Sequence, residues 1–530
     1  MNPCKRITHG LSLLALFGVM AMNGCAGWTK PQPDSQHLAQ VNQLFNDRYA
    51  FVLDTEQLLK TDLSADVEGP TGVLTPGEAI RRALAHNFSL VTQSESLAIA
   101  QANLVQAGLW ENPNIGQTSA FYFPISPGTG PSAAFDLEIT QAINSFLTQP
   151  HKVAIAKAQR LQAGIDMANQ AFGLAQQVQG QYDQLVYITR DGALQRRIAD
   201  TYKQAVDEAR AQLKAGLVTR ADFNRAVIAY EDSLRQAHHY DTQYEGAARQ
   251  MNWLMGVRSA PQWQLPKSVS ESPNVIAALP QEAGFEQLAG KFRLDLLRAD
   301  YDRKIADTSV KLACLGFIPQ TTLGYDAARD GYRNWTGGPN FDTALPIFDP
   351  GIVAFWLAKY QQEQTQRTYV TLQSQVKQDV LNALNALQIA AEDVVFYRDV
   401  TIPQEEENVK LAQLSFKLGN SQFDDLLNSI REYVGVLQNY EDAIQAYHQA
   451  IIGLETAVGL SFPRIERQTT GAALPSINPT GASTAPALLP KDWLTPHEPF
   501  QILEDRRPAT QAIPATQPSG DGLLSPATRP

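Results

Sequence analysis

The chain of 530 residues carries the same pattern twice, and this duplication constrains its fold more than any other feature. Matching positions occur in the same order in both copies: Ala107, Leu109, Pro113, Lys214, Gly216, Asp222, Tyr230, Leu234 and Gly256 correspond to Ala313, Leu315, Pro319, Lys417, Gly419, Asp425, Tyr433, Leu437 and Gly459. Self-similarity at this scale indicates repeated structural units. The sequence therefore predicts two repeats, at 75–257 and 281–462, joined by a linker at 258–280.

Each repeat begins with a helix and continues with strands. Thr75–Leu109 has helical periodicity, and its Thr-Pro-Gly-Glu start suits an N-cap, a first-turn proline and a capping-box glutamate. Two alternating stretches follow, around Ser119–Phe123 and Phe135–Ile143. A turn rich in proline and glycine, Pro127–Pro131, lies between them. The pattern predicts a hairpin with one apolar and one polar face.

The second copy repeats the hairpin around Leu323 and Phe341, with a predicted turn at Arg329–Gly338. Both hairpins could be ordinary surface structures. However, the rest of the chain offers nothing to cover their apolar faces, whereas lipid would cover them. We therefore interpret the four stretches as strands that lie in a membrane.

A very long helical region follows the strands in each copy. Lys152–Lys214 alone would span about 95 Å at 1.5 Å per residue. Gly216 is suited to end this helix, and Thr219–Asp222 to start a second one that runs back. The corresponding tip of the second copy is Gly419–Ser421, and Pro403 should bend the helix about four turns before it. Each repeat is thus expected to contain a long helical hairpin.

The N-terminus is typical of an export signal over residues 1–24, since a basic start precedes the apolar stretch Leu11–Met22. The sequence Asn-Gly-Cys-Ala around Cys25 resembles a bacterial lipobox, which predicts that Cys25 becomes the lipidated first residue. Ordinary signal cleavage without lipidation is the alternative. Residues 25–74 would form the N-terminal segment of the mature lipoprotein.

Composition excludes several classes of function. With 43 Lys and Arg against 54 Asp and Glu, the formal net charge is -11, which is unsuited to nucleic-acid binding. Three cysteines exclude both a disulfide-stapled domain and a cysteine-rich zinc site. The eight histidines form no ligand pair at helical spacing, and neither a phosphate-binding loop nor a nucleophile elbow is present. We expect no enzyme activity, no cofactor and no resident metal.

Four strands per chain are too few to close a membrane barrel, because the smallest barrels have about eight. Unpaired strand edges are not tolerated in lipid, so the chain must oligomerise if its strands insert. Three copies would supply enough strands for one barrel and an equal number of helical columns for one tube. The predicted fold is an α+β membrane protein that forms, as a homotrimer, an outer-membrane β-barrel continuous with a long periplasmic α-helical barrel.

Three segments carry a family resemblance: Gly77–Pro113, Ala215–Asp222 and Leu418–Asp425. Together with the duplication, they resemble the TolC-type outer membrane efflux proteins, and the lipobox is similar to that of the lipoprotein branch that partners RND pumps. The resemblance implies a trimeric channel-tunnel that contacts outer membrane lipid, a periplasmic membrane-fusion adaptor and an inner-membrane pump.

The resemblance also implies roles for residues at the helix tips. Gly216, Leu217, Gly419 and Asn420 would lie where the adaptor docks, although a plain helix end would also explain the glycines. Asp222 and Asp425 would line the periplasmic gate, although acidic residues also stabilise a helix N-terminus. Phe416 matches an aromatic residue of the closed-state latch. The family's latch arginine falls at Ser421 and its second aspartate at Asn428, so we expect Arg220 or Asp424 to substitute.

The function expected from these observations is a passive exit duct of a tripartite efflux pump. The alternatives are a type I secretion channel and a coiled-coil structural lipoprotein without a pore. The transported substrate, whether drug, metal ion or polypeptide, is left open. The segment 463–530 is rich in proline and is expected to be disordered.

Overall fold

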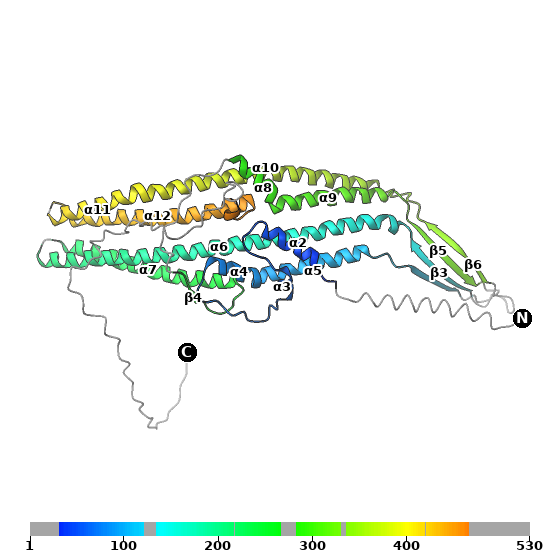
Figure 1. Cartoon of the computed structure of the whole chain (residues 1–530), viewed down its shortest axis with the longest axis horizontal. Helices are drawn as coiled ribbons and strands as arrows, with labels where there is room; N and C mark the ends of the chain where they lie inside the picture. The colour runs from blue at the N-terminus through cyan, green and yellow to red at the C-terminus, as the bar shows by residue number, and fades with distance from the viewer. Residues whose placement is uncertain are drawn as a thin grey trace, which may run out of the picture. The chain divides into compact units, whose positions relative to one another are not determined.

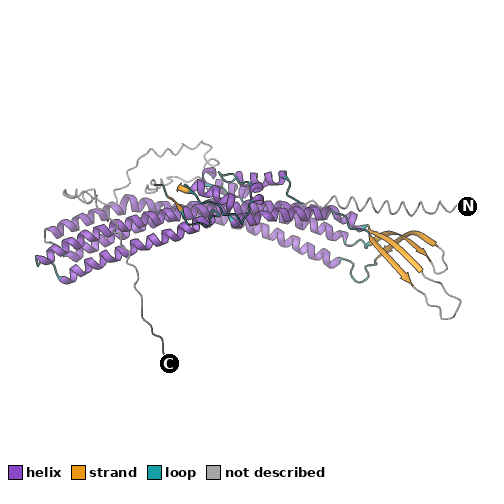
Figure 2. Ribbon diagram, turned by 90° about the horizontal axis from the view of Figure 1, so that it is seen from below, coloured by secondary structure: helices purple, strands orange, loops and turns teal. Residues whose placement is uncertain are grey.

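The computed structural model describes residues 31–120, 134–216, 218–266, 282–329, 335–418 and 420–465. These residues belong to one compact unit. Helices dominate it, and its strands form one sheet of four and one of two (Figures 1 and 2). The export signal, Cys25 and nearly all of the proline-rich segment lie outside the described residues. No helix among the described residues is both long and apolar enough to cross a membrane.

Each repeat consists of helices interrupted by two strands. The first contains α4 (Pro76–His86), α5 (Phe88–Gly108), β2 (Asn114–Ala120), β3 (Ala134–Ala142), α6 (Asn144–Lys214) and α7 (Arg220–Leu254). The second contains α8 (Glu282–Phe292), α9 (Leu294–Leu315), β5 (Thr321–Arg329), β6 (Trp335–Thr343), α10 (Ile352–Phe396), the π-helical turn η3 (Tyr397–Thr401), α11 (Ile402–Lys417) and α12 (Phe423–Val458). Outside these sets lie α2 (Ser35–Asn46), α3 (Thr55–Lys60), β1 (Thr71–Val73) and β4 (Gln262–Gln264).

The helix predicted over Thr75–Leu109 is in fact two helices, which meet at Asn87. The Asn87 side chain accepts hydrogen bonds from the N–H groups of Ser89 and Leu90, so it caps α5. Thr75 caps α4 as predicted. The prediction that Glu78 completes a capping box is wrong. Its carboxylate pairs instead with Arg81 and Arg82, one turn further along α4.

The four-stranded sheet has the order β2-β3-β5-β6, and all three pairings are antiparallel. The predicted bounds need correction. β2 begins at Asn114, before the predicted Ser119, and the turn Pro127–Pro131 lies outside the described residues. The predicted turn Arg329–Gly338 is also wrong, since its last four residues belong to β6. Glycines and a proline are tolerated there because β6 is an edge strand.

The long helix α6 has 71 residues and begins earlier than the predicted Lys152, with Pro150 inside it. At 1.5 Å per residue it is about 107 Å long. Its start is fixed by Asn144, whose side chain accepts a 2.8 Å hydrogen bond from the N–H of Thr321 and donates to the carbonyl of Pro319. In the second repeat, the interruption expected near Pro403 takes the form of η3, a π-helical turn that ends just before α11.

A small structure that the sequence did not predict forms beside the first repeat. β1 pairs in parallel with β4, which falls in the predicted linker. The helix α2 packs on α6 at Gly164, where an added Cβ would lie 2.8 Å from Val41 and 3.1 Å from the His37 ring. The N-terminal segment and the first repeat share one apolar core.

Two glycines at equivalent positions of the repeats allow a close approach of two chain segments. Gly256 and Gly459 end the returning helices with φ of 74° and 76°. A Cβ on Gly256 would lie 2.1 Å from the carbonyl oxygen of His86. A Cβ on Gly459 would lie 3.1 Å from Cα of Arg293. Both the left-handed backbone and the short distances require glycine.

We expect Gly256→Ala to destabilise the protein by more than about 2 kcal/mol, because the substitution adds backbone strain to a collision with the carbonyl group of His86. Gly246→Ala is the matched control, since this glycine lies inside α7 with no atom within 4 Å of an added Cβ. Gly246→Ala should leave the unfolding midpoint unchanged or raise it slightly, because alanine favours a helix more than glycine does. Thermal unfolding in detergent, followed by circular dichroism, measures both. Equal unfolding midpoints for the two variants would contradict the conclusion that position 256 requires glycine.

The docking of α2 should depend on pH through His37. Its side chain is 1% exposed, and both of its ring nitrogens lack a hydrogen-bond partner. Burial lowers the pKa of His37 below its ordinary value, and the nearby Arg160 lowers it further, whereas Asp34 opposes the shift. The docked state therefore favours the neutral ring. Docking is fully stable above pH about 6.5 and is weakened as the pH falls below that value.

The predicted loss of docking is up to about fivefold between pH 6.5 and 5.5, because the released His37 takes up a proton over this range. Hydrogen exchange of the α2 amides, expressed as protection factors, measures it. In the variant His37→Gln, the protection factors should no longer change over this range. A wild-type α2 that stays equally protected at both pH values would show that His37 does not titrate there.

Candidate functional site

The first helix tip joins α6 to α7 through a short turn. Gly216 has a positive φ of 74°, and its N–H donates to the carbonyl of Leu213. Leu217 lies outside the described residues. Thr219 and Asp222 form a reciprocal capping box, in which the Asp222 carboxylate accepts from the Thr219 hydroxyl at 2.6 Å and from its N–H at 3.2 Å. These bonds lower the pKa of Asp222, with the Thr219 hydroxyl as the main cause.

The second tip joins α11 to α12 and is built similarly. Gly419 lies outside the described residues, and the N–H of Asn420 donates to the carbonyl of Ser415 at 2.9 Å. The Asp425 carboxylate accepts from the N–H of Gln422 at 2.9 Å. Phe416, the predicted latch residue, packs against Phe423 with ring centroids 5.5 Å apart. Asp222 and Asp425 thus cap equivalent helices in the two repeats.

An ion-pair bridge connects the two tips. Nη1 of Arg225, on α7, lies 3.1 Å from Asp222 and 3.0 Å from Asp424 on α12. The prediction that Arg220 or Asp424 supplies the missing latch is therefore refined. Asp424 does form a contact between the repeats, but its partner is Arg225. The guanidinium of Arg220 lies over the Phe223 ring instead, 5.4 Å from its centroid.

The structure does not bring all predicted tip residues together. The positions that match the family's latch, Ser421 and Asn428, take no part in the bridge, and Asn428 accepts a hydrogen bond from Arg431 on its own helix. Sequence reasoning missed Arg225, although a signal was available. Arg225 follows Asp222 by three residues, which places the two side chains on the same helix face.

Above the tips, a polar seam joins α6 of the first repeat to α12 of the second. Arg190 and Glu441 form a buried ion pair at 3.0 Å. The Tyr187 hydroxyl donates to Asp442 at 2.7 Å, and Gln445 donates to Gln184 at 2.6 Å. A buried ion pair costs desolvation and contributes mainly by fixing which groups meet. The seam therefore fixes the register between the two repeats.

Two more carboxyl groups in this part of the molecule are shielded from solvent: Asp183 is half-buried and Glu455 is buried. Burial raises the pKa of Asp183 and of Glu455 to about 7. Glu455 also accepts a hydrogen bond of 2.6 Å from the N–H of Phe462, which partly offsets the effect of burial. Neither group was singled out from the sequence, because acidic residues on a long polar helix are usually solvated.

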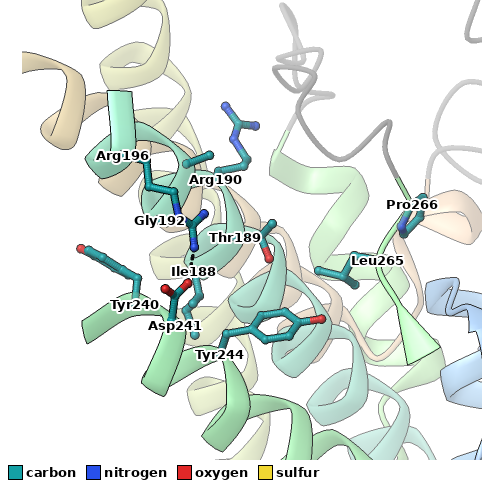
Figure 3. A pocket seen from close by; sticks show the side chains of 11 residues that line it. Ile188, Thr189, Arg190, Gly192, Arg196, Tyr240, Asp241, Tyr244, Leu265 and Pro266 are labelled. Carbon is teal, nitrogen blue, oxygen red and sulfur yellow. Dashed lines mark hydrogen bonds and ion pairs between the residues drawn. The ribbon is translucent and has the colours of Figure 1, made fainter. Parts of the chain in front are cut away.

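A hollow beside the seam lies between α6, α7 and the residues that follow β4 (Figure 3). Tyr240, Tyr244 and Leu265 contribute to its walls. Its two arginines, Arg190 and Arg196, pair with Glu441 and Asp241 and offer no free charge to a ligand. No cluster of potential metal ligands occurs among the described residues. The hollow therefore has no evident catalytic chemistry.

Part of the chain matches the model of a known protein family. Residues 287–460 match the model of the outer membrane efflux protein family, and they cover the second repeat almost completely. The chain is therefore similar to outer membrane efflux proteins over its second repeat. The matched family model describes outer membrane efflux proteins, and solved structures with a similar fold are outer membrane channels. The predicted fold class is confirmed: a duplicated α+β unit in which four strands continue into long helices.

The relatives are distant. The chain is 24% identical over 57% of its length to nodulation protein T of Rhizobium leguminosarum bv. trifolii, and it spans 65% of that protein. It is 22% identical over 70% of its length to the cobalt-zinc-cadmium resistance protein CzcC of Cupriavidus metallidurans, of which it covers 88%. The crystal structure of CusC, described as a transmembrane channel, has a TM-score of 0.62 at 15% identity, covering 75% of this chain and 99% of that one.

The bridge between the tips should limit their motion. Arg225 and Asp424 are 52% and 46% exposed, so the pair is worth roughly 0.2–1 kcal/mol. We expect Asp424→Asn to increase tryptic cleavage after Lys214 and Arg220 by up to about fivefold, the factor that corresponds to such an energy.

Asp207→Asn is the control, because Asp207 pairs with Arg210 on its own helix and connects nothing else. Adding Arg225→Gln to Asp424→Asn should produce little further increase, since the other ion pair of Arg225, with Asp222, lies within α7 and does not connect the tips. Equal cleavage of the Asp424 and Asp207 variants would show that the bridge does not hold the tips.

Proposed function

We propose that this protein is the outer membrane duct of a tripartite efflux pump, most directly one driven by an RND-type inner-membrane transporter. The observation that carries the proposal is the sheet β2-β3-β5-β6 at the start of two long helical hairpins. Its two outer strands, β2 and β6, are each paired on one side only within the chain. Three copies joined edge to edge would remove every unpaired edge and continue into a helical tube.

We also propose an anchor and partners for this duct. Cys25 would carry a lipid that holds the N-terminal segment at the membrane, and palmitate labelling that is lost in Cys25→Ser tests this. The turns around Gly216, Leu217, Gly419 and Asn420 would receive the periplasmic adaptor. A pump that hydrolyses ATP, if captured with the channel, would favour the type I secretion alternative.

The gate would be formed by the acidic tips. Asp222, Asp424 and Asp425 lie within one turn of the helix starts, and Arg225 balances part of their charge. In a trimer, these carboxylates would form a negative ring that concentrates cations. The relative CzcC is named for resistance to cobalt, zinc and cadmium, which agrees with small cations as one substrate class. Small neutral molecules would pass once the pump assembly holds the tips apart.

The charge at the gate can be removed without disturbing the helix caps. In Asp222→Asn with Asp425→Asn, the side-chain oxygens still accept the capping hydrogen bonds while two charges per chain disappear. We expect the double variant to lose cation preference, measured as the reversal potential across a salt gradient in planar bilayers.

Asp232→Asn, an exposed carboxylate on α7 away from the tip, is the matched control and should keep the wild-type value. Trimer yield should be unchanged in all variants. Identical reversal potentials in the wild type and the double variant would assign both aspartates to helix capping alone. Absence of any conductance in the wild type would instead favour the structural lipoprotein without a pore.

A further inference from the structure

The segment between β6 and α10 presents a set of exposed apolar side chains. This segment, residues 344–351, is called the β6 loop below. Leu345 and Ile347 are both 74% exposed, and Phe348 is 99% exposed. Large apolar groups exposed together mark an interaction surface.

Hydrogen bonds at both ends support the backbone of the β6 loop. The N–H of Ala344 donates to Gln320 at 2.9 Å, and the N–H of Gly351 donates to the Asp349 side chain at 3.0 Å. Gly351 has a positive φ of 78°, and an added Cβ would lie 3.0 Å from the carbonyl oxygen of Gly316. The exposed side chains are therefore presented by a fixed backbone.

A second apolar surface lies at the opposite edge of the sheet. The Trp110 patch consists of Leu109, Trp110, Phe146 and Leu147, all of them exposed. The rings of Trp110 and Phe146 pack against each other with centroids 4.6 Å apart. Trp110 comes four residues before the first residue of β2, whereas the β6 loop directly follows the last residue of β6.

Both surfaces lie at the same end of the sheet. The register pairs Asn114 with Thr140, Ala142 with Thr322, and Thr321 with Thr343, so the start of β2 and the end of β6 share that end. β3 and β5 separate them within one chain, a distance of about 14 Å at 4.7–4.9 Å per strand. One chain therefore leaves both surfaces uncovered.

We propose that the β6 loop of one copy packs against the Trp110 patch of the next copy, as an apolar clasp at the junction of sheet and helices. The proposal rests on the trimer of the proposed function. If β6 of one copy pairs with β2 of the next and the alternation of strand directions continues, the pair is antiparallel. The end of β6 then lies beside the start of the neighbouring β2, which brings the two surfaces together. Continuity with the strand edges favours a second copy over lipid as the occupant.

Cross-linking tests the contact. In a Cys314→Ser background, Trp110→Cys and Phe348→Cys are combined and treated with a short bis-methanethiosulfonate reagent in native membranes. Covalent dimers and trimers should appear on denaturing gels. The control pair combines Phe348→Cys with Ile99→Cys, another exposed residue, which lies on α5 about 16 Å before Trp110 at 1.5 Å per residue. Equal cross-linking of both pairs, or of neither pair while heat-labile trimers persist, would overturn the clasp.

A second measurement separates a neighbouring copy from lipid as the occupant. Trp110→Ala and Phe348→Ala should each lower the dissociation temperature of the trimer, and the double variant should lower it no more than the more affected single variant, since both remove one contact. Additive effects would indicate that the two side chains meet lipid independently, and this would overturn the proposal. Absence of any wild-type trimer would contradict the proposed function itself rather than the clasp.

Discussion

The packing of α6 is the constraint on which the rest of the structure depends. This helix contacts α2, α4, α5 and α7 of its own half and α9 and α12 of the other. A helix surrounded in this way needs small side chains where its neighbours approach, and Gly164, Ala168, Ala171 and Ala175 provide them in the central core. The helix α6 starts next to the sheet and ends at the first tip. A continuous, packed helix therefore fixes the distance between the sheet and the tip.

The contact between α6 and α12, one of the places where the two repeats meet, differs chemically from the packing within each repeat. Each repeat packs internally through apolar and small residues, whereas the seam between repeats is held by hydrogen bonds and the pair Arg190–Glu441. Polar contacts of this kind specify partners and register more than they add stability. The same style recurs at the tips, where Arg225 joins Asp424. Opening a gate along the contact between α6 and α12 would therefore have to separate these polar pairs.

The sequence predicted the parts of the fold that depend on local pattern. The duplication, the four strands, the long helices and the caps at Thr75 and Thr219 all follow from periodicity or from residue type at a turn. The break at Asn87 and the early start of α6 did not, because both depend on distant groups: Asn87 donates to the carbonyl of Leu254, and Asn144 contacts Thr321. For the same reason, Arg225 could be placed on the face of Asp222, but its contact with another repeat could not be predicted.

The close approach at Gly256 and Gly459 shows how far the two halves have diverged. Beside Gly256, the neutral amide of Asn87 donates to the carbonyl of Leu254 at 2.9 Å. At the equivalent place beside Gly459, the guanidinium of Arg293 contacts the carbonyl of Ala457 and pairs with Asp295 and Asp379. One junction is thus uncharged and the other is a charged network of three side chains. The halves have ceased to be interchangeable modules, and a chain built from two first repeats would lack the arginine that ties this junction to Asp379 on α10.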